Sequence, residues 1–193
     1  MIYKIKIRPK ALKFIEKLPI QKTEEDREKR VKMWNRMDAN GNGFLTLTEF
    51  DKGVRDVLDL PHFSTLKKVL TRAYQAAKNK VKSKAKYSSD YVEWLEFRFL
   101  LVYLRQYFEY YVMFKRIDES EDFKISLQEF KNAIPTIEKW GVKVTNPAEE
   151  FKKIDKGDGF VMFDEFCEYA IKKNLDLEDD DDFDDCELKN FKG

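Results

Sequence analysis

Histidine and cysteine are scarce in this sequence of 193 residues, which contains one histidine and two cysteines. His62 alone cannot supply a zinc-ligand set, and the sequence contains no phosphate-binding loop or nucleophile elbow. Cys167 and Cys186 show no repeated spacing, which is typical of a reducing compartment rather than of a disulfide scaffold. We therefore expect a protein that is not an enzyme.

Long apolar runs are also missing. The most apolar stretch, Leu95 to Phe114, is interrupted by Glu96, Arg98, Arg105 and Glu109. Charged side chains are costly in lipid, so this stretch cannot span a bilayer and is expected to form the core of a soluble helical protein. The N-terminus has no apolar run of the signal-peptide kind.

Charge is balanced overall but unevenly placed. The net charge is +1, from 37 basic and 36 acidic residues. Basic side chains dominate residues 1–19 and recur at every second position from Lys78 to Lys86, whereas residues 176–187 are acidic without a single base. We interpret residues 1–20 as a basic arm and residues 175–193 as an acidic tail. Such blocks indicate charged partners or mutual screening within the chain.

A repeat organises the sequence between these ends. A Glu-Phe pair occurs four times, as Glu49-Phe50, Glu96-Phe97, Glu129-Phe130 and Glu165-Phe166. An apolar residue stands four positions before each glutamate, at Leu45, Val92, Ile125 and Val161. Apolar residues at helical spacing flank each polar segment, which predicts helix, loop and helix. This is the pattern of the EF-hand.

Four such units predict an all-α fold, with four EF-hands in two paired lobes and short β contacts between paired loops. The first pair covers residues 21–105 with loops 38–49 and 85–96, and the second covers residues 106–174 with loops 118–129 and 155–165. Thr23, followed by acidic residues, predicts a helix start. Pro61 ends the first exit helix, and the next helix is expected from about Ser64 to Lys78.

The first loop has every ligand that calcium requires. An EF-hand supplies oxygen from loop positions 1, 3, 5, 7, 9 and 12, with glycine at position 6. The ligands here are Asp38, Asn40, Asn42, the Phe44 carbonyl, Thr46 and Glu49, and Gly43 stands at position 6. Because only two ligands are carboxylates, we expect weak binding, with a Kd of about 10⁻⁶–10⁻⁴ M.

The second and fourth loops have lost ligands. In the second, Ala85, Tyr87 and Ser89 occupy ligand positions and Asp90 replaces the glycine, so we expect a structural hand. The fourth has 11 residues, from Asp155 to Glu165, and its ninth position is Met162. We expect it to fold as a hand without working as a calcium site.

The third loop is intermediate. Its candidate ligands are Asp118, Ser120, Asp122, the Lys124 carbonyl, Ser126 and Glu129. Position 6 is Phe123, where a positive φ is required, and a bulky residue there costs about 1–3 kcal/mol. The loop offers three carboxylates, which favour calcium binding and so oppose the cost of this strain. We therefore expect a marginal calcium site.

Several segments resemble the calflagin family of flagellar calcium-binding proteins. They are residues 91–98, Val112-Met-Phe, residues 127–135, Lys139-Trp-Gly-Val and Phe163-Asp-Glu-Phe, within a resemblance from Ile15 to Lys173. The resemblance implies a calcium-responsive protein of cilia or flagella. In calflagins the third and fourth loops carry calcium, and an acylated Met-Gly start attaches the protein to membranes. This chain starts Met1-Ile2-Tyr3, so we expect no anchor of that kind.

Two functions remain open. The first is a structural, protein-binding component of the ciliary or flagellar axoneme with residual calcium binding, since one intact loop cannot provide the paired cooperativity of a sensor. The alternative is a calcium sensor that binds a target protein when loaded. Residues 3–8 alternate apolar and basic side chains, which suits an extended strand on an acidic surface such as tubulin. We expect protein partners, with axonemal or microtubule components as candidates, and no nucleic acid. The expected location is the cilium or flagellum, and otherwise the cytoplasm.

Overall fold

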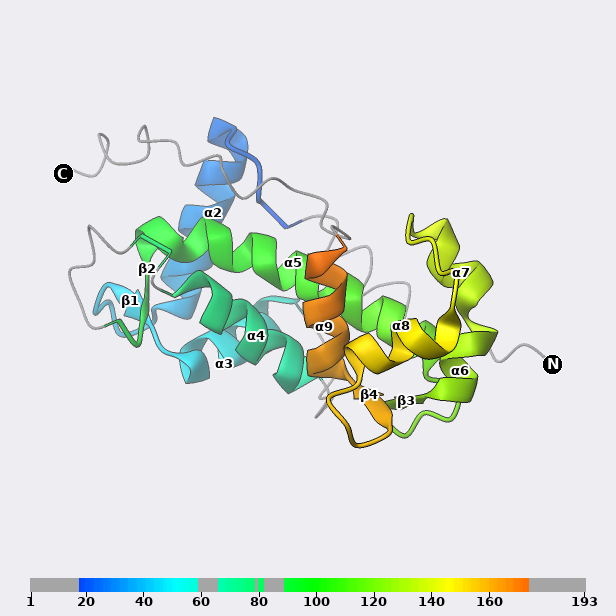
Figure 1. Ribbon diagram of the computed structural model, residues 1–193. Coiled ribbons are helices and arrows are strands. Elements are labelled where there is room, and N and C mark those ends of the chain that lie inside the picture. The colour runs from blue at the N-terminus through cyan, green and yellow to red at the C-terminus, as the bar shows by residue number, and fades with distance from the viewer. Residues whose placement is uncertain (1–17, 59–65, 79, 82–88, 174–193) are drawn as a thin grey trace. The chain divides into compact units, whose positions relative to one another are not determined.

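The computed structural model describes residues 18–58, 66–78, 80–81 and 89–173 of the chain (Figure 1). These residues fall into two compact units that divide between Phe108 and Glu109. We name the described residues up to Phe108 the N-terminal unit and those from Glu109 the C-terminal unit. Helix α5, Trp94–Ile117, contributes residues to both units.

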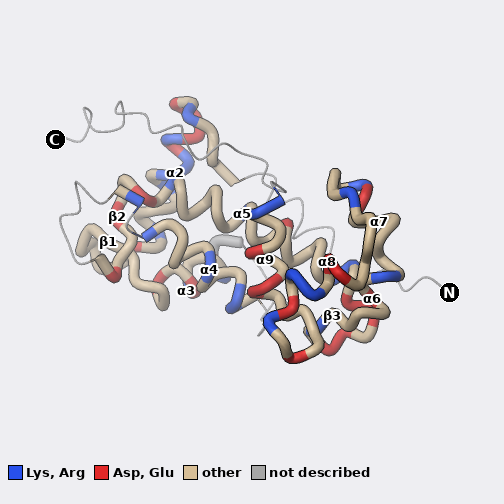
Figure 2. The backbone as a smooth tube through the Cα atoms, viewed as in Figure 1, with Lys and Arg blue, Asp and Glu red and all other residues tan. Residues whose placement is uncertain are grey.

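The N-terminal unit contains the first two hands. Its elements are α2 (Glu24–Met37), β1 (Phe44–Leu45), α3 (Leu47–Leu58), α4 (Leu66–Ala77), β2 (Val92–Glu93) and the first part of α5. Thr23 caps α2 as predicted, because its hydroxyl accepts a hydrogen bond from the Asp26 backbone N–H at 3.3 Å. Charges of both signs line α2 (Figure 2), with acids in the first turn, where the helix dipole favours them.

The two loops of the N-terminal unit meet in a short antiparallel ladder. Strand β1 pairs with β2, and Leu45 lies opposite Val92. Both side chains are fully buried. Phe44 stacks on Tyr91, with ring centroids 4.2 Å apart and an angle of 20° between the planes. The apolar positions of the sequence repeat are therefore the positions at which one loop pairs with the next.

Aromatic contacts and one hydroxyl connect the helices to these loops. Trp34 of α2 meets Phe97 of α5 edge to face, with ring centroids 5.2 Å apart. The Tyr74 hydroxyl of α4 lies 2.8 Å from the carbonyl oxygen of Leu45 and 2.9 Å from that of Asp90. Burial raises the pKa of Tyr74 above its usual value, so the hydroxyl stays protonated and can donate to either loop.

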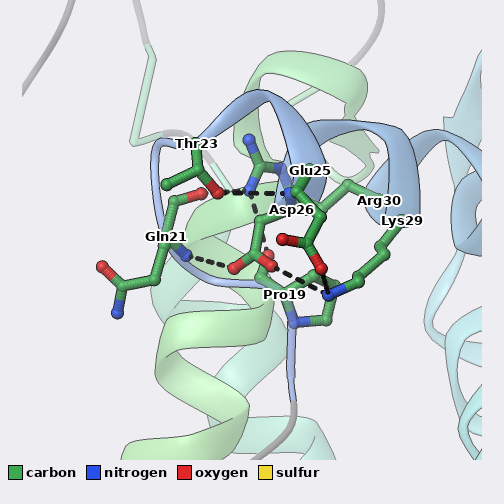
Figure 3. A network of polar contacts seen from close by, with 7 residues as sticks. All are labelled: Pro19, Gln21, Thr23, Glu25, Asp26, Lys29 and Arg30. Atoms are coloured by element: carbon green, nitrogen blue, oxygen red, sulfur yellow. Dashed lines mark hydrogen bonds and ion pairs between the residues drawn. The ribbon is translucent and has the colours of Figure 1, made fainter.

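A buried arginine fixes the chain just before α2 (Figure 3). Arg30 donates hydrogen bonds to the backbone carbonyls of Pro19, at 3.0 Å, and Gln21, at 2.6 Å. Leu18 and Ile20 are buried in the same segment. The last residues of the predicted basic arm are thus part of the packed N-terminal unit.

The C-terminal unit contains the third and fourth hands. Its elements are the last part of α5, β3 (Lys124–Ser126), α6 (Leu127–Asn132), α7 (Ile134–Lys139), α8 (Pro147–Ile154), β4 (Phe160–Met162) and α9 (Phe163–Lys172). Strands β3 and β4 are antiparallel, with the buried residues Ile125 and Val161 opposite each other. Phe114 of α5 contacts Phe163 and Phe166 of α9 edge to face. The helical fold with paired loops confirms the predicted fold class.

Some predictions concern residues outside the described ranges. They are the basic arm over residues 1–17, Pro61, His62, Ala85, Tyr87, Cys186 and the acidic tail. Cys167 lies in α9 and is buried. Of the helices in the described ranges, none has the length and apolar character needed to cross a membrane.

Candidate metal centres

The first loop brings the side chains at its beginning and end together. The Asp38 carboxylate accepts hydrogen bonds from the backbone N–H groups of Asn42, at 3.1 Å, and Gly43, at 3.0 Å. Across the loop, Asn40 Nδ2 lies 2.7 Å from Glu49 Oε1, although nine residues separate the two. Positions 3 and 12 of the loop therefore face each other, while position 1 binds the backbone of the turn.

Two glycines allow this curvature. Gly41 and Gly43 have φ values of 66° and 87°, in the left-handed region that costs glycine nothing. A Cβ added to Gly41 would meet nothing within 4 Å, so glycine is needed there for its backbone conformation and not for space. The Thr46 hydroxyl donates to Glu49 Oε2 at 2.8 Å, so two of the predicted ligands contact each other at the end of the loop.

The donor chemistry of the first loop fits calcium. The predicted ligands are two carboxylates, two amide oxygens, one hydroxyl and one carbonyl, and calcium prefers six to eight oxygen ligands of this kind. Within the described ranges, no group of three or more histidine, cysteine or acidic residues is placed to hold a metal ion. The site depends on neutral oxygens as much as on carboxylates. Its ligand set stays a prediction, with Asp38 and Glu49 as the two charged members.

One hydrogen bond recurs in all four hands. The glutamate at position 12 accepts from the backbone N–H at position 9 through its Oε2. The pairs are Thr46 and Glu49 at 2.9 Å, Glu93 and Glu96 at 3.1 Å, Ser126 and Glu129 at 2.8 Å, and Met162 and Glu165 at 2.8 Å. This contact explains why the glutamate is present in loops that lack other ligands, because it closes the loop onto the exit helix.

In the second hand, the other oxygen of the glutamate also reaches the chain before the loop. In the first, third and fourth loops, Oε1 faces the residue nine positions before the glutamate, which is loop position 3 when the glutamate is position 12. These residues are Asn40, Ser120 and Lys156 respectively. In the second, Glu96 Oε1 lies 3.4 Å from the backbone nitrogen of Val81, which precedes the loop. Glu96 thus connects the loop to the preceding chain, which supports the interpretation of a structural hand.

The third loop, like the first, closes with hydrogen bonds to the carboxylates at its positions 1 and 12. Asp118 Oδ2 accepts from the Phe123 backbone N–H at 3.2 Å, and Glu129 Oε1 accepts from the Ser120 N–H at 2.9 Å. Burial disfavours ionisation of Glu129, but hydrogen bonds from Ser126 and Ser120 outweigh it and lower the pKa of this carboxyl. Glu129 therefore favours its ionised form, in which it accepts these hydrogen bonds.

The backbone of the third loop is strained at two positions. Phe123 has a φ of 66°, as its place in the loop predicts, and Glu121 has a φ of 62°. Each such non-glycine residue costs about 1–3 kcal/mol. The strain at Glu121 was not anticipated, although Gly41 at the same position of the first loop is the signal for it. The Phe123 ring packs beside Tyr111 and Phe114, with centroids 6.4 and 6.5 Å away, which offsets part of the cost.

A lysine that the loop pattern does not include lies within the third hand. Lys115, in the last turn of α5, places its Nζ 2.7 Å from Asp118 Oδ2. The Lys115 side chain is 9% exposed and that of Asp118 is 0% exposed. Lys115 Nζ also lies 4.5 Å from the centre of the Phe123 ring. The first ligand position of the third loop is thus already in contact with a positive charge.

The fourth loop closes despite its missing residue. Asp155 accepts hydrogen bonds from the backbone N–H groups of Gly157, Asp158 and Gly159 at 2.7–3.3 Å, so it takes the role of the first position. The deletion shortens the turn that follows. Lys156 directs its Nζ to Glu168, 3.0 Å away, and not into the loop. The loop folds as a hand, in agreement with the sequence-based expectation.

Comparison with known proteins identifies the family. Residues 14–104 match a family model described as FCaBP EF-hand domain. The flagellar calcium-binding protein of Trypanosoma cruzi is 38% identical over 170 residues, which cover 86% of this chain and 80% of that protein. The chain belongs to the flagellar calcium-binding protein family. The resemblance inferred from the sequence is therefore confirmed.

Further comparisons agree with this family. Flagellar calcium-binding protein TB-24 of Trypanosoma brucei brucei is 38% identical over 170 residues, covering 86% of this chain and 77% of that protein. These relatives are named for calcium binding rather than for an enzymatic activity. A solved structure of a homolog of programmed cell death 6 protein from Leishmania major Friedlin covers 80% of this chain and 77% of its own, with 18% identity and a TM-score of 0.42. The family assignment rests on the sequence relatives and not on that structure.

Proposed function

We propose that this member of the flagellar calcium-binding protein family is a structural, protein-binding component of the flagellum or cilium that holds calcium in its first loop. The observation that carries the proposal is the closure of that loop, in which Asn40 Nδ2 and Glu49 Oε1 lie 2.7 Å apart and Asp38 accepts hydrogen bonds from the backbone of Asn42 and Gly43. The six ligands predicted from the sequence all supply oxygen, which suits calcium. The calcium would be held by the six ligands named from the sequence.

The location follows from the relatives, which carry the word flagellar in their names. The structural role is supported by the hands that have lost ligands. The second and fourth loops keep the hydrogen bond that closes an EF-hand, through Glu96 and Glu165, while their ligand sets are incomplete. A hand that keeps its fold without its metal serves as a packing module, and an axonemal protein is the partner class we favour.

A calcium sensor is the second candidate function. The third loop favours it, because Asp118 and Glu129 make the same backbone hydrogen bonds as their counterparts in the first loop. A sensor would expose apolar surface on loading, since calcium opens the helix pairs of sensor EF-hands.

Fractionation of isolated flagella separates the two functions. A structural component held by buried contacts is expected to remain with the axoneme through 1 M salt and through chelator. Salt at that concentration shortens the Debye length from about 8 Å to about 3 Å and so removes purely electrostatic docking. Release by chelator alone would contradict the structural role and favour the sensor. Release by salt alone would favour attachment through charge, as from the basic arm.

A further inference from the structure

The contact between Lys115 and Asp118 has no counterpart between Lys152 and Asp155 of the fourth hand, although a lysine stands at the same position there. Lys152 stands three residues before Asp155, just as Lys115 stands three residues before Asp118. Lys152 is exposed, whereas Lys115 is buried, with its Nζ 2.7 Å from Asp118 Oδ2. The burial of Lys115 is therefore a property of the third hand and not of a lysine at this position.

The third loop builds a place for this ammonium. Asp118 provides a fully buried carboxylate on one side, and the Phe123 ring provides an aromatic face on the other, with its centre 4.5 Å from Nζ. Aromatic faces attract cations, and the attraction strengthens when the pair is removed from water. Phe123 takes a strained φ of 66°, so the residue that disturbs the turn of a calcium loop also completes the surroundings of the lysine.

We propose that the Lys115 ammonium is a built-in cation of the third hand, which holds the loop folded without metal and competes with calcium for Asp118. A buried carboxylate needs a positive partner, because an unpaired buried charge is strongly destabilising. Lys115 fills that need at Asp118 Oδ2. Two cations repel each other at such short range, so calcium bound to Asp118 would have to displace the Lys115 ammonium. The ammonium would then lose its carboxylate partner.

This inference rests on the proposed function only in taking calcium as the competing ion. Calcium binding at the first loop can be present or absent without affecting it. If Lys115 were a structural residue alone, its removal would leave calcium binding unchanged or would weaken it by loosening the loop. Competition predicts instead that removal of Lys115 makes calcium bind more tightly.

The test uses the full chain with Glu49→Gln, which silences the first loop. Lys115→Met is added, because methionine keeps most of the aliphatic length and removes the charge. Calcium titration by calorimetry is expected to show binding at the third loop on the order of tenfold tighter, which is about 1.4 kcal/mol. Without calcium, the denaturation midpoint of the same variant is expected to fall, and calcium is expected to restore it. Adding Glu129→Gln should remove the gain, which assigns it to the third loop.

Lys152→Met is the matched control, since it removes the same charge from the equivalent position of the fourth hand, where the lysine is exposed. It should change neither the calcium affinity nor the midpoint. Unchanged or weaker calcium binding in the Lys115→Met protein overturns the proposal. If that protein folds only when calcium is present, the proposal is supported. Lys115→Gln, which removes the charge but keeps a hydrogen-bond donor for Asp118, is measured in parallel. It should also bind calcium more tightly than the protein with Lys115, and no gain in affinity in either variant overturns the proposal.

Discussion

Phe44 in the first loop stacks on Tyr91 in the second, with ring centroids 4.2 Å apart. Phe44 is also the residue whose carbonyl is the predicted seventh-position ligand, and it lies in the strand that pairs with β2. The second hand, whose ligand set is predicted to be incomplete, thus supports the backbone of the hand that is predicted to bind calcium.

This contact predicts an effect of Tyr91→Ala on calcium binding at the first loop. Loss of the stacked ring removes about 0.5–1.5 kcal/mol of interaction and leaves the Phe44 backbone less restrained. We expect calcium affinity at the first loop to fall by about 2- to 10-fold in titration calorimetry. Tyr91→Phe keeps the ring and should bind like the unchanged protein. Equal weakening in both variants would show that the stacking is irrelevant.

A second prediction concerns the turn of the third loop. Phe123→Gly relieves the strain at φ 66°, which costs about 1–3 kcal/mol, and should produce a new or tighter calcium site in calorimetry. Phe123→Ala is the control, because it removes the ring but keeps the Cβ and therefore the strain. If alanine tightens binding as much as glycine does, the ring over Lys115 limits the site and the turn does not. If neither variant gains affinity, the turn does not limit the site, and Lys115, Ser120 or the fourth hand is responsible.

A third prediction concerns acid stability and the contact between α8 and α9. Lys173 Nζ lies 2.7 Å from Glu150 Oε1, Lys153 Nζ lies 2.9 Å from Oε2, and the Tyr169 hydroxyl donates to Oε1 at 3.1 Å. The Lys173 hydrogen bond is the main cause that lowers the pKa of Glu150 to about 2, against the opposing effect of burial.

The sign of the pH dependence follows from this lowered pKa. A carboxyl with a depressed folded pKa stabilises the protein above its unfolded pKa, and the contribution disappears as the pH falls from about 4.5 towards about 2. Glu150→Gln is expected to lower the free energy of unfolding by about 1–3 kcal/mol at pH 7, because charged hydrogen bonds are lost. The difference from the unchanged protein should vanish near pH 2 in denaturation followed by circular dichroism. Glu149→Gln, an exposed neighbour, is the control, and an equal loss in both variants would contradict the prediction.

Much of this arrangement is predictable from the sequence because a repeat fixes equivalent positions. Leu45, Val92, Ile125 and Val161 were singled out by their distance from a glutamate, and the structure pairs the first with the second and the third with the fourth. The left-handed backbone at Phe123 also followed from its place in the loop. In both cases local spacing determines the geometry.

Other features depend on packing that spacing does not report. Lys115 and Lys152 occupy the same position in their hands, yet one is buried and the other is exposed. Lys115 Nζ lies 4.5 Å from the centre of the Phe123 ring, whereas the residue equivalent to Phe123 in the fourth loop is Gly159, which has no ring. In the shortened fourth loop, the sequence places Asp155 at the start but does not show that Lys156 turns its Nζ to Glu168, 3.0 Å away.

The central claim is that calcium is held by the loop from Asp38 to Glu49. Trp34 is suited to report on it, because the Asp38 backbone N–H donates to the Trp34 carbonyl at 2.8 Å and the indole therefore lies one helical turn before the site. Terbium bound in place of calcium should emit when tryptophan is excited, and Trp140→Phe, in the C-terminal unit, should leave that emission unchanged.

The deciding measurement is tryptophan-sensitised terbium emission from Glu49→Gln and Glu129→Gln proteins, titrated side by side with calcium as competitor. The account predicts that Glu49→Gln abolishes most of the emission and that Glu129→Gln retains it. Emission that survives Glu49→Gln but disappears with Glu129→Gln would contradict the claim and place the calcium in the third loop.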